Sequence, residues 1–361
     1  MEQTVLVSFF IIARNAEATL PGLLQDLKAQ DYPAKQMELI LCDSLSEDGT
    51  KAVFESFSRE NAEAYHRICL LENKGGTLPH GWNTCLLEAT GELIIRVDAH
   101  SSLPSDFVRS NVISYLSGHD VSGGPRTSIA SEKGAWQQTL LVAENSLFGS
   151  GLAGYRHEQG AKETDTVAHG AYARYVFETV GGYDERLTRT EDNEMHHRIR
   201  KAGFHIYTDP TIRSWHRIRS SFPKMLRQKY ANGYWIGLTL GVVPGCIRLF
   251  HLVPGCFVLG LIFCGVLALL GFPLLLQLCL GAYMLVNLLM SALAWIKEKP
   301  FTPAFFLLPV LFFMLHLAYG AGTLVGLIKL PFWKKNHKSC EAKERVRLAL
   351  IANNPKKEEN S

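Results

Sequence analysis

The sequence predicts an α/β domain with a mainly parallel sheet, followed by C-terminal transmembrane helices. Short apolar runs of strand length alternate with segments of helical periodicity through the first part of the 361-residue chain. This alternation is typical of a parallel sheet covered by helices on both faces. Polar and acidic residues directly follow several of the apolar runs, and a long, strongly apolar tract occupies the C-terminal third.

The predicted elements follow one another in a regular order as far as residue 97. Residues 5–13 form a continuous apolar run, and helical spacing of leucines begins at Leu20. The predicted strands cover residues 5–13, 38–42, 68–71, 93–97, 121–125 and 204–207. Further helices are predicted at residues 50–57, 82–90, 136–148 and 191–202.

The composition changes sharply after residue 235. Residues 236–330 contain five charged residues, whereas residues 1–235 have the mixed composition of a soluble domain. Three apolar segments, residues 252–270, 274–295 and 304–328, are each long enough to cross a hydrocarbon core of ~30 Å. We therefore expect a domain at residues 1–235, an interfacial segment at 236–250, a membrane domain of about three helices at 251–330, and a basic, partly disordered tail at 331–361.

The side of the membrane on which the tail lies is left open by the sequence. The run at residues 5–13 lacks a preceding basic region and fits a strand better than a secretory signal, so we expect the N-terminal domain in the cytosol. Three crossings would then put the tail outside, but its excess of Lys and Arg favours the inside. Either one segment is re-entrant or the interfacial segment also inserts.

Charge and cysteine content exclude some classes of function. A net charge of +3 does not indicate nucleic-acid binding. The basic tail is interpreted either as a surface for anionic lipid or as a solvated segment. The eight cysteines contain no CxxC pair, which fits a reducing compartment and gives no support for a zinc site.

Three clusters carry most of the functional information. They are residues 43–50 (DSLSEDGT), residues 96–100 (RVDAH) and residues 190–192 (TED). Asn15, Asp43 and Asp98 each follow a predicted strand, where ligands bind in parallel sheets. Carboxylates at such ends are suited to a nucleotide and a metal, and an acid at a helix entrance is suited to act as a base.

The order of these clusters, with residues 181–185 (GGYDE) before the third, resembles the inverting nucleotide-sugar glycosyltransferases of family 2. The resemblance covers roughly residues 5–235 and implies the GT-A fold, which is Rossmann-like. The Asp98-Ala99-His100 form and the apolar C-terminal segments look most like the succinoglycan-type exopolysaccharide glucosyltransferases.

The resemblance implies donor-binding roles for five residues. Asp43 would contact the uracil of the donor, and Asp48 would bind the ribose or stabilise its turn. Asn15 and Glu17 would line the nucleotide pocket, and Asp98 would serve the diphosphate. The alternative for the loop residues is a purely structural role in their turns.

The resemblance also implies a divalent metal, Mn²⁺ or Mg²⁺. Asp98 and His100 occupy the positions of the family's DxD motif, with His100 in place of the second Asp. Imidazole suits Mn²⁺ better than Mg²⁺, and His100 could instead donate to a phosphate. His216 is a further candidate ligand, because some family members have a histidine there.

The catalytic base is predicted to be Asp192, with Glu191 as the second candidate. Inversion requires a base that takes the proton of the acceptor hydroxyl, and a helix N-terminus favours a charged carboxylate. Processive relatives carry a QxxRW motif, but the residue directly before Trp235 is not an arginine. This departure favours the addition of one sugar over processive polymer synthesis.

We therefore expect a multi-pass protein of the cell (inner) membrane whose catalytic domain faces the cytosol. It would move a sugar, expected to be glucose, from a UDP-sugar to a lipid-linked saccharide in exopolysaccharide or cell-surface glycan synthesis. Membrane lipid and a polysaccharide assembly complex are the other expected partners, and nucleic acid is not. The alternatives are a polyprenyl-phosphate sugar synthase and a non-catalytic scaffold that binds nucleotide sugars.

Overall fold

The chain packs into two units, each built from segments that are distant in sequence. The computed structural model describes residues 4–130, 132–149, 160–297, 302–337 and 340–353. The sheet unit consists of Met1–Thr127, His157–His216 and Ser339–Ser361. The helical unit consists of Ser128–Arg156 and Arg217–Lys338. The linear division into domains expected from composition remains a prediction.

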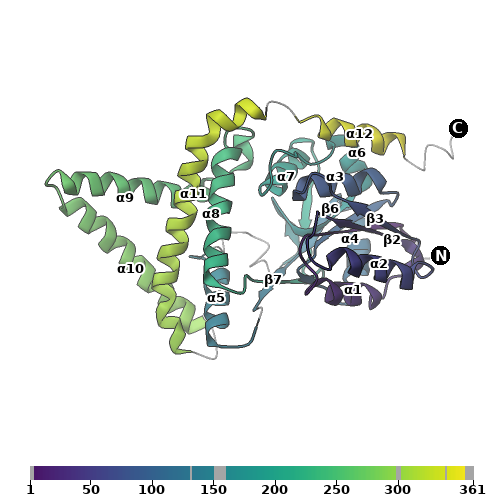
Figure 1. The fold of residues 1–361 in the computed structure, drawn as a ribbon, viewed down its shortest axis with the longest axis horizontal. Helices are drawn as coiled ribbons and strands as arrows, with labels where there is room; N and C mark the ends of the chain where they lie inside the picture. Colours follow the sequence, from purple (N-terminus) through teal and green to yellow (C-terminus); the bar gives the residue numbers. More distant parts are fainter. Residues whose placement is uncertain (1–3, 131, 150–159, 298–301, 338–339, 354–361) are drawn as a thin grey trace. The chain divides into compact units, whose positions relative to one another are not determined.

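An eight-stranded sheet forms the centre of the sheet unit (Figure 1). Its strands are β1 (Val7–Ala13), β2 (Met37–Asp43), β3 (Arg67–Glu72), β4 (Leu93–Asp98), β6 (Val121–Gly124), β8 (Lys162–Glu163), β9 (Ala168–Ala173) and β10 (Ile206–Thr208). They lie in the order β3-β2-β1-β4-β9-β6-β10-β8. The first four strands of this order are parallel, as are β6 and β10, whereas β9 and β8 run antiparallel to their neighbours. The predicted mainly parallel sheet is confirmed.

Helices cover both faces of this sheet. One apolar core contains residues of α1 (Leu20–Lys28), α2 (Thr50–Asn61) and α4 (Phe107–Leu116). The other contains residues of α3 (Leu78–Glu88), α6 (Arg174–Val180), α7 (Glu191–Lys201) and α12 (Ala342–Ala352). Strand residues alternate between the cores: Phe9 lies in the first and Phe10 in the second. Because both faces are buried, β1 and β2 read in the sequence as continuous apolar runs.

Shorter elements complete the backbone. A three-stranded sheet contains β5 (Ser101–Ser102), β11 (Ser214–Arg217) and β7 (Arg126–Ile129), in that order. Short 3₁₀ helices are η1 (Ala34–Gln36), η3 (Pro244–Cys246), η4 (Leu249–His251) and η5 (Pro303–Leu307).

The helical unit contains α5 (Ala135–Asn145), α8 (Phe222–Thr239), α9 (Val253–Leu269), α10 (Leu274–Lys297) and α11 (Leu308–Asn336). α8 and α11 lie side by side (Figure 1). A Cβ on Gly233 of α8 would lie 1.9 Å from the carbonyl oxygen of Tyr319, and one on Gly322 of α11 would lie 2.1 Å from that of Tyr230. Glycines therefore allow direct backbone contact between the two helices, as in small-residue packing of membrane helices.

The three predicted apolar segments are all helical. Within the described residues, Leu274–Lys297 and Pro303–Asn336 are long and apolar enough to cross a membrane. α9 is a shorter apolar helix of 17 residues. These two candidates are consistent with membrane association.

Several elements were not predicted from the sequence. β9 (Ala168–Ala173), the antiparallel strand between β4 and β6, contains none of the β-branched residues typical of strands. No element was predicted for the stretch that forms α8, and α12 forms within the expected tail. α3 begins at Leu78 rather than near residue 82, because Pro79 is accommodated in its first turn.

Candidate active site

The carboxyl ends of the central strands bring two predicted acids to the same edge of the sheet. Asp43 of β2 pairs in register with Ala13 of β1, and Asp98 of β4 pairs with Ile12. One oxygen of Asp43 accepts a hydrogen bond from the amide of Ser46 at 3.2 Å. The other, Oδ1, is buried without a hydrogen-bond partner among the described residues. Asp43 therefore keeps one carboxylate oxygen to which a bound base could donate.

The loops after β1 and β2 hold each other in place. Glu47 donates its amide to Asn15 Oδ1 at 2.8 Å, and Gly49 donates its amide to Glu17 Oε2 at 3.0 Å. Asp48 accepts from the amides of Glu17 at 3.2 Å and Thr50 at 3.0 Å. Asn15, Glu17 and Asp48 thus have the structural role in their turns that was the alternative to donor binding.

Asp98 lies among cationic and imidazole groups. Its Oδ2 is 3.5 Å from His169 Nε2 and 3.6 Å from Arg126 Nη1. Burial by itself would raise the pKa of Asp98, but His169 and Arg126 hold it below its usual value. His169 is fixed by Ser101 and Ser214 hydroxyls, each 2.9 Å from one of its ring nitrogens. Asp98 is therefore ionised and held in one orientation.

The two predicted metal-binding histidines differ in their surroundings. His100 Nδ1 lies 3.0 Å from the hydroxyl of Thr19. His216 is paired in register with Ser101, and its Nδ1 is buried without a hydrogen-bond partner among the described residues. Burial, together with the charge of Arg126, lowers the pKa of His216 to about 3. His216 is thus a neutral imidazole, the form that a metal requires.

The candidate metal ligands among the described residues are too few to hold an ion by themselves. In the described part of the chain, no group of three His, Cys, Asp or Glu side chains could hold an ion without help. Asp98 offers a carboxylate, and its negative charge acts to raise the pKa of His216 against the effect of burial. A protein that supplies so few ligands usually shares the ion with substrate phosphates.

The N-terminus of α7 presents two acids in opposite environments. The Asp192 side chain is 41% exposed, whereas Glu191 is 4% exposed and its Oε2 has no hydrogen-bond partner among the described residues. Burial raises the pKa of Glu191 well above its usual value, and the negative charges of Asp192 and Asp98 act in the same direction. Because the charge of Asp98 acts on Glu191, the acids at the start of α7 lie near the carboxyl end of β4.

Arg96 of β4 anchors Asp192. Its Nη2 donates a hydrogen bond to Asp192 Oδ1 in an ion pair. The guanidinium is buried over the rings of Trp82 at 5.1 Å, Tyr183 at 5.3 Å and Tyr172 at 5.9 Å. Burial alone would lower the pKa of Arg96, but Asp192 and the neighbouring groups raise it well above its usual value. A permanent cation therefore holds the exposed carboxylate in one place.

Arg96, His169 and Arg126 were not among the predicted catalytic, donor-binding or metal-binding residues, although Arg96 lies within the second cluster. Arg96 had a detectable signal, because a charged residue inside an apolar strand needs a buried partner. His169 has φ of +47° just before Gly170, a conformation that the sequence does not reveal. Arg126 follows Pro125 in a stretch without periodicity.

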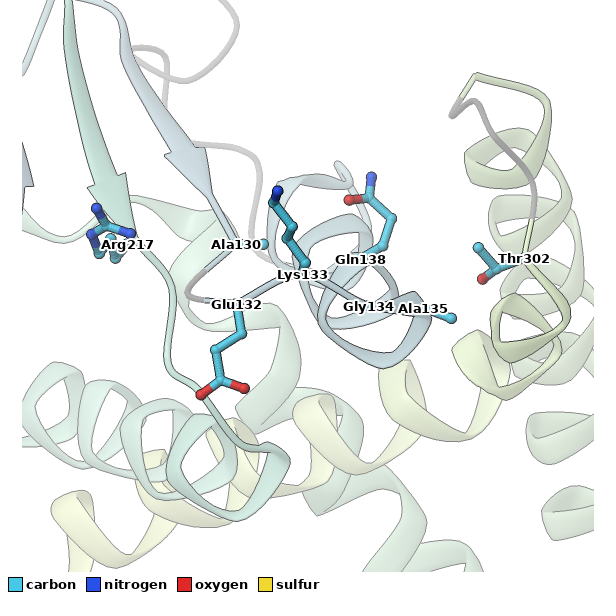
Figure 2. A pocket seen from close by; sticks show the side chains of 8 residues that line it. All are labelled: Ala130, Glu132, Lys133, Gly134, Ala135, Gln138, Arg217 and Thr302. Carbon is cyan, nitrogen blue, oxygen red and sulfur yellow. The ribbon is translucent and has the colours of Figure 1, made fainter.

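A separate open pocket of about 650 Å³ lies within the helical unit (Figure 2). Its lining includes the start of α5 and combines two cations, Lys133 and Arg217, with the acid Glu132. This mixture of charges does not select one kind of ligand, and the pocket contains none of the predicted site residues.

Comparison with known proteins identifies the family. The family model described as Glycosyl transferase family 2 matches residues 8–181. The chain is 37% identical over 250 residues to "Putative glycosyltransferase EpsE" of Bacillus subtilis, which covers 67% of this chain and 82% of that protein. The chain belongs to glycosyltransferase family 2. The prediction of a glycosyltransferase is confirmed at this level.

Two further relatives of this family 2 enzyme carry more specific names. A Methanococcus voltae protein named dolichyl N-acetyl-alpha-D-glucosaminyl phosphate 3-beta-D-2,3-diacetamido-2,3-dideoxy-beta-D-glucuronosyltransferase is 26% identical over 336 residues, 90% of this chain and 97% of its own length. Succinoglycan biosynthesis protein ExoA of Rhizobium meliloti is 29% identical over 220 residues, 58% of this chain and 63% of its own length.

A solved structure supports the GT-A fold. The mannosyltransferase PcManGT of Pyrobaculum calidifontis, solved in complex with GDP-Man and Mn²⁺, matches with a TM-score of 0.58. It covers 90% of this chain and 88% of its own chain at 16% sequence identity. At that identity the likeness concerns the fold alone.

Proposed function

We propose that this family 2 enzyme is a membrane-bound inverting glycosyltransferase. It moves a sugar, glucose in our proposal, from a UDP-sugar to a lipid-linked saccharide in exopolysaccharide or cell-surface glycan synthesis. The observation that carries the proposal is the exposed carboxylate of Asp192, anchored by buried Arg96 near Asp98 at the strand ends.

Asp192 is the general base of the proposed reaction. Its carboxylate takes the proton of the acceptor hydroxyl while that oxygen forms a bond to the anomeric carbon. The bond from the anomeric carbon to the diphosphate breaks on the opposite side, and UDP leaves with the bonding electrons. An α-linked donor then gives a β-linked product. Glu191 supports this chemistry as a buried neighbour, because its raised pKa favours a protonated carboxyl.

The donor is proposed to bind along the carboxyl edge of the sheet. Asp43 accepts a hydrogen bond from the uracil at its unpartnered Oδ1, with the Asn15–Glu17 and Asp48 loops beside it. A divalent cation, Mn²⁺ or Mg²⁺, would be held by Asp98 with His216, or with His100, together with the donor. Such an ion neutralises the charge on the leaving diphosphate.

The lipid-linked acceptor is proposed from two observations. The Methanococcus relative, whose name gives a dolichyl-linked sugar phosphate as its acceptor, matches over nearly its whole length. The described residues also include two helices suited to a membrane. We infer that the enzyme resides in the cell (inner) membrane as a multi-pass protein, with its catalytic domain on the cytosolic side and a polysaccharide assembly complex as a further partner.

The experiment that tests the proposal measures release of UDP or GDP by detergent-purified enzyme supplied with lipid extract. UDP-sugars and GDP-sugars are compared, because the solved neighbour was bound to GDP-Man. We expect release with UDP-glucose and Mn²⁺, loss of release with chelator, and a fall of about 10³-fold in kcat for Asp192→Asn, within the range for a general base. Release with GDP-sugars alone would refute the donor assignment.

The same assay separates the two alternatives. A polyprenyl-phosphate acceptor is already ionised and needs no base, so a polyprenyl-phosphate sugar synthase would lose little activity in Asp192→Asn. A non-catalytic scaffold would bind UDP with Mn²⁺ saturably and release no product with any donor or acceptor lipid. Either result would replace the proposed reaction.

A further inference from the structure

The C-terminal helix α12 is part of the sheet unit, although the helical unit separates it in the chain from the other elements there. It packs against α6 and α3 (Figure 1). Val346 and Leu350 are fully buried in the same apolar core as Met195 and Ile199 of α7. The apolar face of α12 therefore belongs to the same core as the helix that carries the proposed base.

The backbone of α12 is also bound by the sheet unit. Buried Arg174 donates hydrogen bonds from Nη2 to the carbonyl oxygens of Leu350 at 3.1 Å and Asn353 at 3.3 Å. These carbonyls are among those that a helix C-terminus leaves without partners, so Arg174 caps α12. The same guanidinium also donates to Glu178 and to the carbonyl oxygen of Ala89, so Arg174 ties the end of α12 to other elements of the sheet unit.

The two glycines before Tyr183 form the contact with the start of α12. Gly181 has φ of +79°, and a Cβ there would lie 2.4 Å from the carbonyl oxygen of Lys343. The amide of Gly182 donates to that same carbonyl at 3.1 Å. The approach of α12 thus gives a physical reason for two consecutive glycines at this point.

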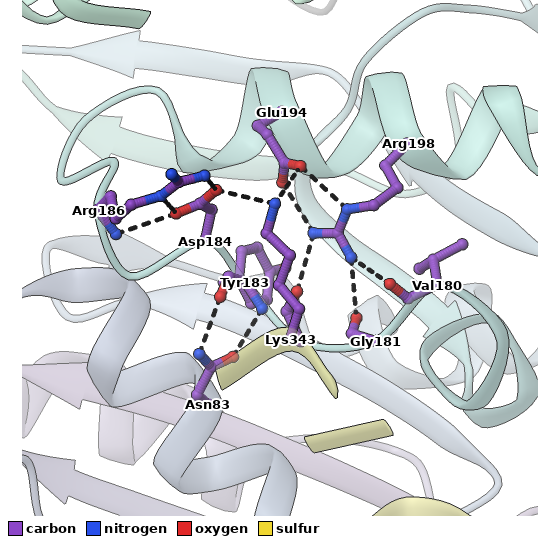
Figure 3. Close-up of polar contacts among 10 residues, drawn as sticks. Asn83, Val180, Gly181, Tyr183, Asp184, Arg186, Glu194, Arg198 and Lys343 are labelled. Atoms are coloured by element: carbon purple, nitrogen blue, oxygen red, sulfur yellow. Dashed lines mark hydrogen bonds and ion pairs between the residues drawn. The ribbon is translucent and has the colours of Figure 1, made fainter. Parts of the chain in front are cut away.

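Lys343 of α12 links this loop to α7 (Figure 3). Its Nζ lies 2.8 Å from Asp184 Oδ2 and 2.9 Å from Glu194 Oε1. Both acids are almost fully buried, and each has a second cation: Arg186 for Asp184 and Arg198 for Glu194. Burial alone would raise the pKa of both carboxyls, but these cations lower it. Of the cations labelled in Figure 3, Lys343 pairs with both Asp184 and Glu194.

We propose that Lys343 is a positioning residue for catalysis, through which α12 sets the N-terminus of α7. Glu194 follows Asp192 by two residues on the same helix, so the Lys343 bridge fixes the start of α7 relative to the Asp184 loop. Without it, the first turn of α7 can shift and Asp192 moves relative to the sugar. This inference rests on the proposed role of Asp192.

The proposal has a consequence for membrane topology. If α12 completes the sheet unit, the chain must return to the face of the membrane on which the N-terminal segment lies. The chain then crosses the membrane an even number of times. The basic tail therefore lies on the same side of the membrane as the N-terminal segment. The two helices suited to span a membrane among the described residues satisfy this requirement.

The test uses the full-length membrane protein and three variants of α12. Lys343→Met removes the cation and keeps the chain length, and Lys343→Arg restores a cation. Arg347→Met is the matched control, because Arg347 pairs with Glu344 of its own helix. Each variant is examined by amide hydrogen exchange of residues 190–198, by kcat and KM for sugar transfer, and by protease access to N-terminal and C-terminal tags in sealed vesicles.

We expect Lys343→Met to speed exchange at the start of α7 and to lower kcat about tenfold, with little change in donor KM. Lys343→Arg should recover most of kcat, Arg347→Met should match the wild type, and both tags should be cut from the same face. Unchanged exchange in Lys343→Met would overturn the positioning role even if the enzyme assay itself fails. Faster exchange with unchanged kcat would reduce Lys343 to a structural residue, and cutting of the tags from opposite faces would refute the placement of α12.

Discussion

Replacing Arg96 tests the arrangement on which the proposed catalysis depends. Arg96→Met removes the guanidinium that pairs with Asp192 and lies over three aromatic rings. Methionine fills much of the space without charge, so Asp192 is released while the surrounding rings remain covered. Arg96→Lys retains a positive charge but lacks the planar fork that binds a carboxylate and stacks on rings.

The expected magnitudes follow from the burial of the two partners. Breaking a fully buried ion pair costs about 3–5 kcal/mol, but Asp192 is 41% exposed and water can solvate it when Arg96 is absent. We therefore expect a loss of about 1–2 kcal/mol in the free energy of unfolding, to which the lost contacts with the rings contribute. The catalytic loss should be larger, about 100-fold in kcat, because the base is no longer held in position.

The assay compares kcat, KM and the melting temperature of the wild type, Arg96→Met, Arg96→Lys and Arg67→Met. Arg67 pairs with buried Glu38 at 2.7 Å near the amino ends of β3 and β2, away from the strand ends that carry the site. Its loss should lower stability and leave kcat nearly unchanged. The reasoning is refuted if Arg96→Met keeps kcat within about twofold of the wild type, a change below 0.5 kcal/mol.

Three further outcomes are expected. Glu191→Gln should reduce kcat far less than Asp192→Asn, because the raised pKa of buried Glu191 favours a protonated carboxyl that glutamine resembles; equal losses in the two variants would contradict this. Burial lowers the pKa of His196 to about 4. Below about pH 6.5 the unfolded chain therefore binds a proton that the folded chain does not. The free energy of unfolding of the wild type should fall by about 3 kcal/mol as the pH falls to 4. His196→Asn should lack this part of the dependence of melting temperature on pH. Gly322→Ala should lower the melting temperature by an amount equivalent to about 1–3 kcal/mol, since its Cβ would meet the Tyr230 carbonyl, whereas Gly265→Ala faces open space and should not.

Local patterns in the sequence were sufficient for the parallel strands β1 to β4 and for the acids at their carboxyl ends. β1, β2 and β4 are mostly apolar because both of their faces are buried, and a strand that ends in Asp43 or Asp98 delivers that residue to the carboxyl edge. The helix that begins at Glu191 was predicted because its periodicity and its closing glycine are local features. These are properties that a short stretch of chain carries by itself.

The sequence by itself therefore determined the fold class, the family and the identity of the candidate acids. Tertiary structure alone decided which acids are paired with distant cations: Arg96 reaches Asp192 across 96 positions, and Lys343 reaches Glu194 across 149. It also decided that β9 is a strand and that α12 belongs to the sheet unit, since both depend on burial supplied by distant segments. The physical reason is that charge pairing and burial act over distances in space, whereas periodicity and turn chemistry act between neighbours along the chain.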